Sequence, residues 1–254
     1  MSDLNKTDLN KTDHDVENLD YLNVDPLEES YRESIAEAPG VVESIEKHKT
    51  ALLVIDLQYL DAAPGYGVFA DDAKSGVHKE AQEYYFKRLE HVVLPNVRKL
   101  QDKFRDLDME VIHTRIMSIT KDGRERSAGH KRLNLHAPPG SKESEFLTEV
   151  APKGDELVFN KTASGVFNAT NLEYILRNMG ITGLFVCGVY TNECVSTTVR
   201  DACDLGFYTT MINDACATVT PQLHNATIET IRDRYARVMT TEEAVKEIKE
   251  HASV

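Results

Sequence analysis

From Thr50 onward, apolar runs of strand length alternate with amphipathic stretches of helix length. This alternation restricts the fold more than any other feature, because strands connected by helices pair in parallel within one sheet. The predicted strands cover residues 51–56, 109–115, 156–161, 183–189, 207–214 and 236–240. The predicted helices cover residues 88–107, 169–179, 194–205, 221–234 and 241–250. The sequence therefore predicts an α/β fold with a sheet of six strands.

Several residues predict where helices begin and end. Thr170 and Glu173 have the spacing of a capping box, in which a hydroxyl and a carboxylate satisfy the free backbone donors of a helix start. Gly180 and Gly206 follow two predicted helices, at the position where a residue tolerant of positive φ is favoured. We therefore expect one helix to begin near Thr170.

The first 47 residues differ from the rest in composition. The motif DLNKT occurs twice within residues 3–12, and the sequence stays polar and acidic to about Asp25. Such a segment buries too little apolar surface to order itself. We predict a partly disordered N-terminal extension over residues 1–47, with a short helix within residues 26–38, and a folded domain over residues 48–254.

Charge and cysteine content exclude several classes of protein. The formal net charge of −13 argues against nucleic acid and anionic membranes as partners. The four cysteines fall within residues 187–216 without a CxxC pair, which is atypical of disulfide scaffolds and zinc sites. No apolar run reaches the length of a membrane span, and no apolar signal core is present at the N-terminus. We therefore predict a cytoplasmic protein.

Three residues that can carry chemistry lie at the ends of predicted strands: Asp56, Lys161 and Cys194. In open α/β folds, the carboxyl edge of the sheet is where ligands bind. Cys194 also begins a predicted helix, whose N-terminal dipole favours a thiolate. Taken alone, each residue also fits a structural role, such as a buried cysteine, a capping aspartate or a surface lysine. Together they predict a sulfur nucleophile beside an acid and a base.

Other residues near this edge are candidates for substrate contacts. Arg115 follows a predicted strand and suits a forked hydrogen bond, although a surface salt bridge fits it equally well. Tyr190 and Phe167 have side chains that suit the wall of a small flat pocket, and packing under the next helix is the alternative for Phe167. His113 is expected to be a buried strand residue. The long charged loop over residues 116–150 is expected to cover the site.

Five sequence segments carry a resemblance to a known family. They are the D-x-Q of Asp56 and Gln58, NKTASGVF (160–167), GVYTNECV (188–195), RDACDLGF (200–207) and RVMTTEEAV (237–245). Together they resemble the isochorismatase-like cysteine hydrolases, and look closest to the ureidoacrylate, N-carbamoyl and biuret amidohydrolases.

The resemblance implies a six-stranded parallel sheet with helices on both faces, and a catalytic triad of Asp56, Lys161 and Cys194. It further implies a cis peptide bond between Val189 and Tyr190, and an oxyanion hole made by the backbone amides of Tyr190 and Cys194. We assign Arg115, Gln58, Phe167 and Tyr190 to substrate binding. Family members are commonly dimers or tetramers, so a homo-oligomer is expected.

The metal-binding D-x-H pattern of the nicotinamidases in this family is absent, since Leu57 and Gln58 follow Asp56 and no histidine lies near Asp61. No metal or other cofactor is therefore predicted. The predicted activity is thiol-dependent hydrolysis of a small linear amide, ureido or N-carbamoyl compound. Two alternatives stay open: a vinyl-ether hydrolase of the isochorismatase type, and a catalytically idle binding module.

Overall fold

The computed structural model describes residues 27–70 and 76–252. These residues contain one sheet of six parallel strands in the order β3-β2-β1-β4-β5-β6. The strands are β1 (Thr50–Ile55), β2 (Val111–Ile116), β3 (Leu157–Lys161), β4 (Gly183–Val189), β5 (Tyr208–Ala217) and β6 (Arg237–Met239). The predicted parallel sheet is confirmed, because each predicted strand overlaps an observed one.

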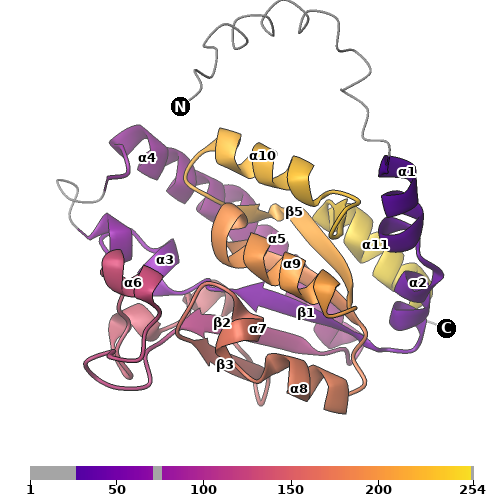
Figure 1. Ribbon diagram of the computed structural model, residues 1–254, viewed down its shortest axis with the longest axis horizontal. Coiled ribbons are helices and arrows are strands. Elements are labelled where there is room, and N and C mark those ends of the chain that lie inside the picture. Colours follow the sequence, from indigo (N-terminus) through magenta and orange to yellow (C-terminus); the bar gives the residue numbers. More distant parts are fainter. Residues whose placement is uncertain (1–26, 71–75, 253–254) are drawn as a thin grey trace, which may run out of the picture.

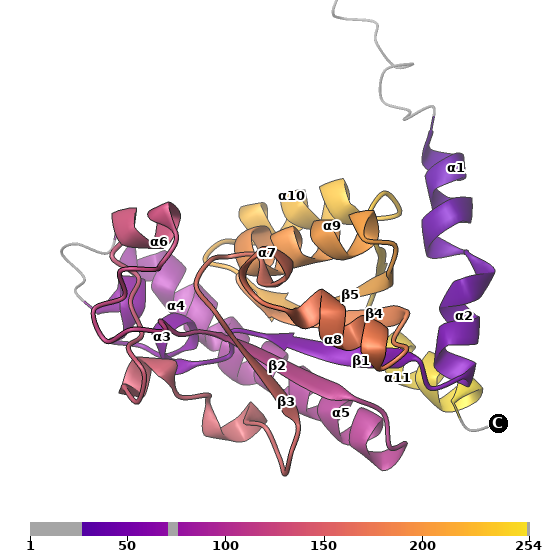
Figure 2. The same cartoon turned by 60° about the horizontal axis from the view of Figure 1, so that its bottom comes forward.

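Helices cover both faces of the sheet, which gives three layers (Figures 1 and 2). One face carries α5 (Leu94–Asp106) and α11 (Thr241–His251). The other face carries α7 (Val166–Ala169), α8 (Leu172–Asn178), α9 (Ser196–Asp204) and α10 (Pro221–Ile231). The helices on both faces that the resemblance implies are thus present.

Shorter helical elements connect the layers. The α-helical ones are α1 (Glu28–Tyr31), α2 (Pro39–Glu46), α3 (Tyr59–Ala62), α4 (Lys79–Arg88) and α6 (Ala128–Arg132). Three π-helical turns are η3 (Arg32–Ala36), η5 (Leu89–Val93) and η8 (Thr191–Val195), and three 3₁₀ turns are η4 (Gly67–Phe69), η6 (Lys142–Ser144) and η7 (Thr148–Val150). Since α4, η5 and α5 run on without a break, the helix predicted at 88–107 begins earlier, at Lys79.

The two central strands, β1 and β4, are buried along their whole length. Both read as near-continuous apolar runs, TALLVI and GLFVCGV, because helices cover the sheet on both sides. The edge strand β3 differs, since its Val158 is 37% exposed. The centre of the sheet is therefore the most rigid part from which side chains can be presented.

The strand order reverses between β1 and β4. The chain proceeds outward from β1 to β2 and β3, then returns to place β4 on the other side of β1. Ligands in open α/β sheets bind at the carboxyl ends of strands where the order reverses in this way. Asp56 directly follows β1, and η8 with Cys194 follows β4, so both lie at this point.

The capping box predicted at Thr170 and Glu173 is wrong. Thr170 has an extended backbone, and its Oγ1 accepts a hydrogen bond from the Leu172 amide at 3.1 Å, while α8 begins at Leu172. Glu173 forms an ion pair with Arg177 instead, at 3.6 Å. The turn that joins α7 to α8 displaces the helix start by two residues. A true capping box links Thr240 and Glu243 at the start of α11.

Gly180 and Gly206 follow α8 and α9 with φ angles of 71° and 82°. Only glycine adopts such left-handed conformations without a steric penalty. The two predicted helix ends are therefore confirmed.

The boundary predicted at residue 47 needs a correction. Helix α2 (Pro39–Glu46) packs on the folded body, and its Ile45 is fully buried in the hydrophobic core. The body therefore includes residues from Pro39. The helical turns over residues 28–36 confirm the short helix predicted there. The tandem repeat at residues 3–12 lies outside the described residues.

Candidate active site

Asp56 is placed by the end of β1. Its backbone has a φ of 53°, a left-handed conformation that aspartate tolerates better than most residues, so the chain turns sharply as the strand ends. The side chain is fully buried. Its Oδ1 accepts a hydrogen bond from Thr114 Oγ1 at 3.0 Å, and its Oδ2 lies 2.7 Å from Lys161 Nζ.

Lys161 is the last residue of β3 and is also fully buried. Its Nζ lies 2.7 Å from Asp56 Oδ2, and donates to Ala163 O at 3.0 Å and to Cys194 Sγ at 3.3 Å. Two of the three N–H donors of the ammonium group make these hydrogen bonds, and the contact with Asp56 is an ion pair. The lysine thus links the carboxylate and the thiol in one buried cluster.

Cys194 lies in the π-helical turn η8 between β4 and α9, with 4% of its surface exposed. Gly188 permits this turn to lie close to β1. It has a φ of 120°, and a Cβ atom there would lie 2.1 Å from the Ile55 carbonyl oxygen. The peptide bond between Val189 and Tyr190 is cis, as the resemblance implies.

The charge state of the thiol differs from the prediction. Burial raises the pKa of Cys194 well above its ordinary value, and the carboxyl groups of Asp56 and Asp61 raise it further, while Lys161 opposes them. Burial would lower the pKa of Lys161, but Asp56 and Cys194 outweigh that effect and raise it. The resting site therefore favours a protonated thiol beside a charged ammonium, because desolvation outweighs the helix dipole.

Gln58 does not present a free amide to a substrate. The side chain is fully buried, and its Oε1 accepts from the Ile116 amide at 2.5 Å. Its Nε2 donates to Ile116 O at 2.9 Å and to Glu143 O at 2.8 Å. Gln58 therefore ties the end of β2 and the following loop to the segment after β1, and these contacts argue against the predicted substrate contact.

Arg115 points away from the cluster. It lies within β2 rather than after it, and successive side chains of a strand point to opposite faces. Thr114 contacts Asp56, so Arg115 faces the other way, where it donates to Asn160 Oδ1 at 2.7 Å and to Ser144 O at 2.8 Å. Arg115 therefore lies on the face away from the cluster, and its substrate contact stays a prediction.

The two predicted aromatic contacts also have other partners. Phe167 stacks on Phe207, with ring centroids 5.9 Å apart, next to the amino end of β5. Its packing role, the alternative weighed above, is the observed one. Tyr190 lies beside the cluster, but its hydroxyl donates to the Asp61 carbonyl oxygen at 3.0 Å.

The loop over residues 116–150 covers the carboxyl end of β3, as predicted. The Met117 amide donates to Lys161 O at 3.1 Å, and the Ser127 amide donates to Thr162 O at 2.9 Å. The loop thus contacts the end of β3 that carries Lys161.

The remaining cysteines and His113 behave mostly as predicted. All four cysteines are free thiols; Cys187 and Cys216 are fully buried, whereas Cys203 is partly exposed. His113 is fully buried within β2, and its Nε2 lies 2.9 Å from Glu156 Oε2.

Sequence reasoning missed two polar residues of the site, Asp61 on α3 and His130 on α6. Each is 3% exposed, and each interacts electrostatically with the Asp56–Lys161 pair. The signal for Asp61 was an acid among apolar neighbours in a buried segment just after β1. The loop that contains His130 has no periodicity, so no pattern marked that residue.

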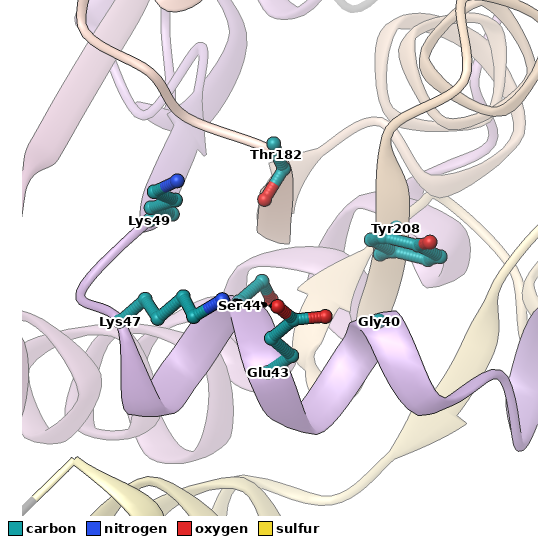
Figure 3. A pocket seen from close by; sticks show the side chains of 7 residues that line it. All are labelled: Gly40, Glu43, Ser44, Lys47, Lys49, Thr182 and Tyr208. Carbon is teal, nitrogen blue, oxygen red and sulfur yellow. Dashed lines mark hydrogen bonds and ion pairs between the residues drawn. The ribbon is translucent and has the colours of Figure 1, made fainter.

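A hollow lies at the amino ends of the strands, on the opposite side of the sheet from the cluster (Figure 3). It is formed where α2 meets the residues that precede or begin β1, β4 and β5, and is lined by Gly40, Glu43, Ser44, Lys47, Lys49, Thr182 and Tyr208. Its polar groups pair with one another, as in the ion pair of Lys47 with Glu43 and the 2.8 Å contact of Ser44 with Thr50. It is remote from the cluster, which lies at the carboxyl ends.

The described residues contain neither a group of three or more His, Cys, Asp or Glu side chains placed to hold a metal ion nor a helix apolar and long enough to cross a membrane.

Comparisons with known proteins agree with this geometry. Residues 50–243 match the family described as Isochorismatase domain. The chain is 30% identical over 213 residues to the isochorismatase family protein YwoC of Bacillus subtilis, which covers 81% of this chain and 97% of that protein. It is 25% identical over 203 residues to the maleamate amidohydrolase of Pseudomonas putida, which covers 79% of this chain and 87% of that protein.

The fold also matches solved structures. An isochorismatase family protein from Desulfovibrio vulgaris superposes with a TM-score of 0.66 at 22% identity, covering 79% of this chain and 98% of that chain. At that identity, the likeness establishes the three-layer fold alone.

Proposed function

The chain belongs to the isochorismatase family, and from that premise we propose that it is a hydrolase that uses Cys194 to cleave a C–N bond. The proposed substrate is a small linear amide, ureido or N-carbamoyl compound. The reaction adds water across the C–N bond, and yields an acid and ammonia or an amine.

One observation carries this proposal. Lys161 Nζ lies 2.7 Å from Asp56 Oδ2 and 3.3 Å from Cys194 Sγ, and the three side chains are at most 4% exposed. A buried ion pair costs desolvation energy that apolar side chains of similar volume would avoid. An ion pair placed against a thiol at the reversal of the strand order is therefore better explained by catalysis than by stability.

In the first half-reaction, Asp56 takes the thiol proton as the Cys194 sulfur attacks the carbonyl carbon. The raised pKa of the resting thiol makes a positioned base necessary, and Lys161 stabilises the thiolate as it forms. The tetrahedral intermediate then expels the amine, which receives the proton from Asp56, and a thioester remains.

In the second half-reaction, Asp56 takes a proton from water, which attacks the thioester carbon. The Cys194 sulfur leaves and recovers the proton, so the acid product and the resting thiol are formed together. Both intermediates carry an oxyanion, for which we propose the backbone amides of Tyr190 and Cys194 as donors. The proposed chemistry uses side chains, backbone amides and water.

Two features favour linear amides as the substrate class. A relative of comparable length is a maleamate amidohydrolase. The segment GVYTNECVSTTVRDA also resembles the ureido and N-carbamoyl members of the family. A homo-oligomer and a cytoplasmic location stay predictions.

The test is ammonia release from a panel of primary amides, ureido acids and N-carbamoyl compounds, with and without iodoacetamide. We expect turnover of at least one compound, its loss on alkylation, and its loss by roughly 10³-fold or more in Cys194→Ala. A rapid quench followed by mass spectrometry of the intact protein should detect the thioester on Cys194.

Cys203→Ala supplies the matched control, because this thiol is the partly exposed one and iodoacetamide also reaches it. The variant should keep its activity and its sensitivity to alkylation. Turnover that survives in Cys194→Ala would instead favour acid-catalysed vinyl-ether chemistry. Failure to hydrolyse any panel member would favour the binding module.

A further inference from the structure

One carboxyl oxygen of Asp61, Oδ2, lacks a hydrogen-bond partner although it is buried. Helix α3 follows Asp56 closely and brings Asp61 beside the cluster. Two tyrosine hydroxyls, of Tyr85 and Tyr190, donate to the Asp61 backbone carbonyl at 2.8 Å and 3.0 Å, which fixes the position of this residue. The side-chain Oδ2 receives no hydrogen bond.

The imidazole of His130 is in the same situation. It reaches the cluster from α6, whose first turn is capped by Ser127, with the His130 amide donating to Ser127 Oγ at 3.1 Å. The ring is 3% exposed, and its Nδ1 has no hydrogen-bond partner. Buried polar atoms in proteins are nearly always paired, so each exception calls for an explanation.

Both groups interact electrostatically with the same ion pair and favour uncharged forms. Burial, the Asp56 carboxylate and the Glu193 carboxylate raise the pKa of Asp61 well above its ordinary value, against the opposing effect of Lys161. Burial and the Lys161 ammonium lower the pKa of His130 to about 4. A neutral carboxyl and a neutral imidazole therefore border the cluster from two separate segments.

We propose that Asp61 and His130 form a polar subsite beside Cys194 that binds a second, uncharged amide or ureido group of the substrate. This inference rests on the proposed function and specifies its substrate class. Both residues bind and orient the substrate, while the chemical step stays with Asp56, Lys161 and Cys194.

Hydrogen-bond complementarity supports an uncharged group. A protonated carboxyl presents one donor and one acceptor, which match the C=O and N–H of an amide, and a neutral imidazole adds a further donor or acceptor. A substrate that pairs these buried atoms recovers the cost of their desolvation.

Charge argues against an anionic group at the same place. The carboxylates of Asp56 and Glu193 both act on Asp61, whereas the Lys161 ammonium is already paired with Asp56. Arg115, which sequence reasoning offered as a partner for a substrate carboxylate, lies on the other face. A carboxylate tail would therefore meet like charge on the Asp61 side, and the other cation that acts on His130, Arg126, is held by the carbonyl oxygens of Gly123 and Leu135.

The test measures binding to the full chain carrying Cys194→Ala, so that it is independent of turnover. Three probes share one skeleton: propionamide with a methyl tail, malonamide with an amide tail and malonamate with a carboxylate tail. Calorimetry should show malonamide binding about tenfold or more tightly than either of the others. Adding Asp61→Leu or His130→Leu should remove most of that preference while propionamide binding changes by less than about threefold.

His113→Leu is the matched control, because it removes another buried imidazole but from the opposite face of β2. It should leave the preference for malonamide intact. Equal binding of malonamide and propionamide would overturn the proposal, as would a preference for malonamate or a malonamide preference that survives Asp61→Leu.

Turnover separates this inference from the proposed function. If the enzyme with Cys194 intact hydrolyses propionamide and malonamide equally well, the subsite is wrong while the cysteine mechanism stands. If Cys194→Ala binds malonamide selectively but the intact protein releases no ammonia, the subsite stands and the hydrolase assignment fails.

Discussion

The two ends of strand β3 both carry largely buried ion pairs, but only at the amino end do both carboxylate oxygens of the pair have hydrogen-bond partners. There, Glu156 accepts from Arg105 at 2.6 Å and 3.0 Å, and lies 2.9 Å from His113 Nε2. Burial would raise the pKa of Glu156, but the hydrogen bonds from Arg105, the Lys153 amide and His113 lower it overall. This carboxylate is stabilised in its charged form.

At the carboxyl end, acids outnumber the available cation. Lys161 pairs with Asp56, while Asp61 has an unpaired oxygen and a pKa held well above its ordinary value by burial and by Asp56. Native structures tolerate such unmatched polar groups mainly at functional sites. We infer from this difference that the Glu156–Arg105 pair stabilises the fold. The Asp56–Lys161 pair is maintained for binding and chemistry at a cost in stability.

Removal of the Lys161 charge should have the largest effect. Lys161→Met leaves the Asp56 carboxylate buried without its cation, which should lower the free energy of unfolding by about 3–5 kcal/mol. Ammonia release should fall by roughly 10³-fold or more, since the thiolate loses its stabilising charge. Urea unfolding and the ammonia assay measure both effects.

The double variant Asp56→Asn/Lys161→Met sharpens this test. It removes both charges, so it should recover much of the lost stability but none of the activity. A double variant that is less stable than Lys161→Met alone would show that the pair contributes to stability as the amino-end pair does.

Gly188→Ala should have the next largest effect, because it disturbs the carboxyl end of β4. The added Cβ would lie 2.1 Å from Ile55 O at a φ of 120°, so we expect a loss of about 2–4 kcal/mol in unfolding free energy. Gly180→Ala, before the amino end of the same strand, meets no atom within 4 Å and should cost only about 1 kcal/mol. Equal losses of unfolding free energy in Gly188→Ala and Gly180→Ala would show that the two ends of β4 do not differ in this respect.

Glu156→Gln tests the amino-end pair. Loss of the charged hydrogen bonds with Arg105 and His113 should lower the free energy of unfolding by about 1–2 kcal/mol. The kcat/KM for the best amide should stay within about threefold of wild type, since the cluster is at the other end of β3. A much larger loss of activity, with the fold intact, would show that the two ends are coupled.

The pH dependence of stability should separate the two ends further. Burial lowers the pKa of His130 and of His224 to about 4, so the unfolded state binds protons that the folded state rejects. The contribution of these histidines to stability should therefore fall as the pH drops from about 6.5 toward 4, by about 1 kcal/mol per histidine at pH 5.5, while Asp61 and Glu193, whose pKa values are raised, act in the opposite direction. Glu156, whose pKa is lowered, contributes stability that is lost only below about 4.5.

Urea unfolding at pH 8, 6.5, 5.5 and 4.5 measures this slope. His224→Asn should flatten it between pH 6.5 and 4.5, whereas Glu156→Gln should leave it unchanged over that interval. A slope that persists in His224→Asn and His130→Gln would assign the effect to other groups.

Much of the fold was predictable because burial dictates it. A strand covered on both faces must be apolar along its length, so ALLVI and GLFVCGV mark β1 and β4 without further information. Parallel strands end at one edge, so the polar residues that follow them meet there. The proximity of Asp56, Lys161 and Cys194 follows from that rule.

Other expectations differ from the structure where the sequence pattern does not define the direction of a side chain or its partners. The strand β2 is mostly buried on both sides, so its alternation does not reveal which face lies toward the cluster, and Arg115 lies on the other one. The Gln58 amide was expected to be free to bind substrate, because its partners, Ile116 and Glu143, come from distant segments of the sequence. The start of α8 depended on a turn after α7, which short-range spacing does not define.

The layered parallel sheet could be predicted from the sequence alone. So could the meeting of an acid, a lysine and a thiol at the carboxyl ends of the strands. These features depend on local hydrophobicity and chain direction, which sequence order encodes. The charge states of Cys194 and Lys161, and the neighbours of these residues, became known only from the tertiary structure. Desolvation and Coulomb interactions depend on distances across the fold, and it was the packing of α3 and α6 that brought Asp61 and His130 against the buried pair.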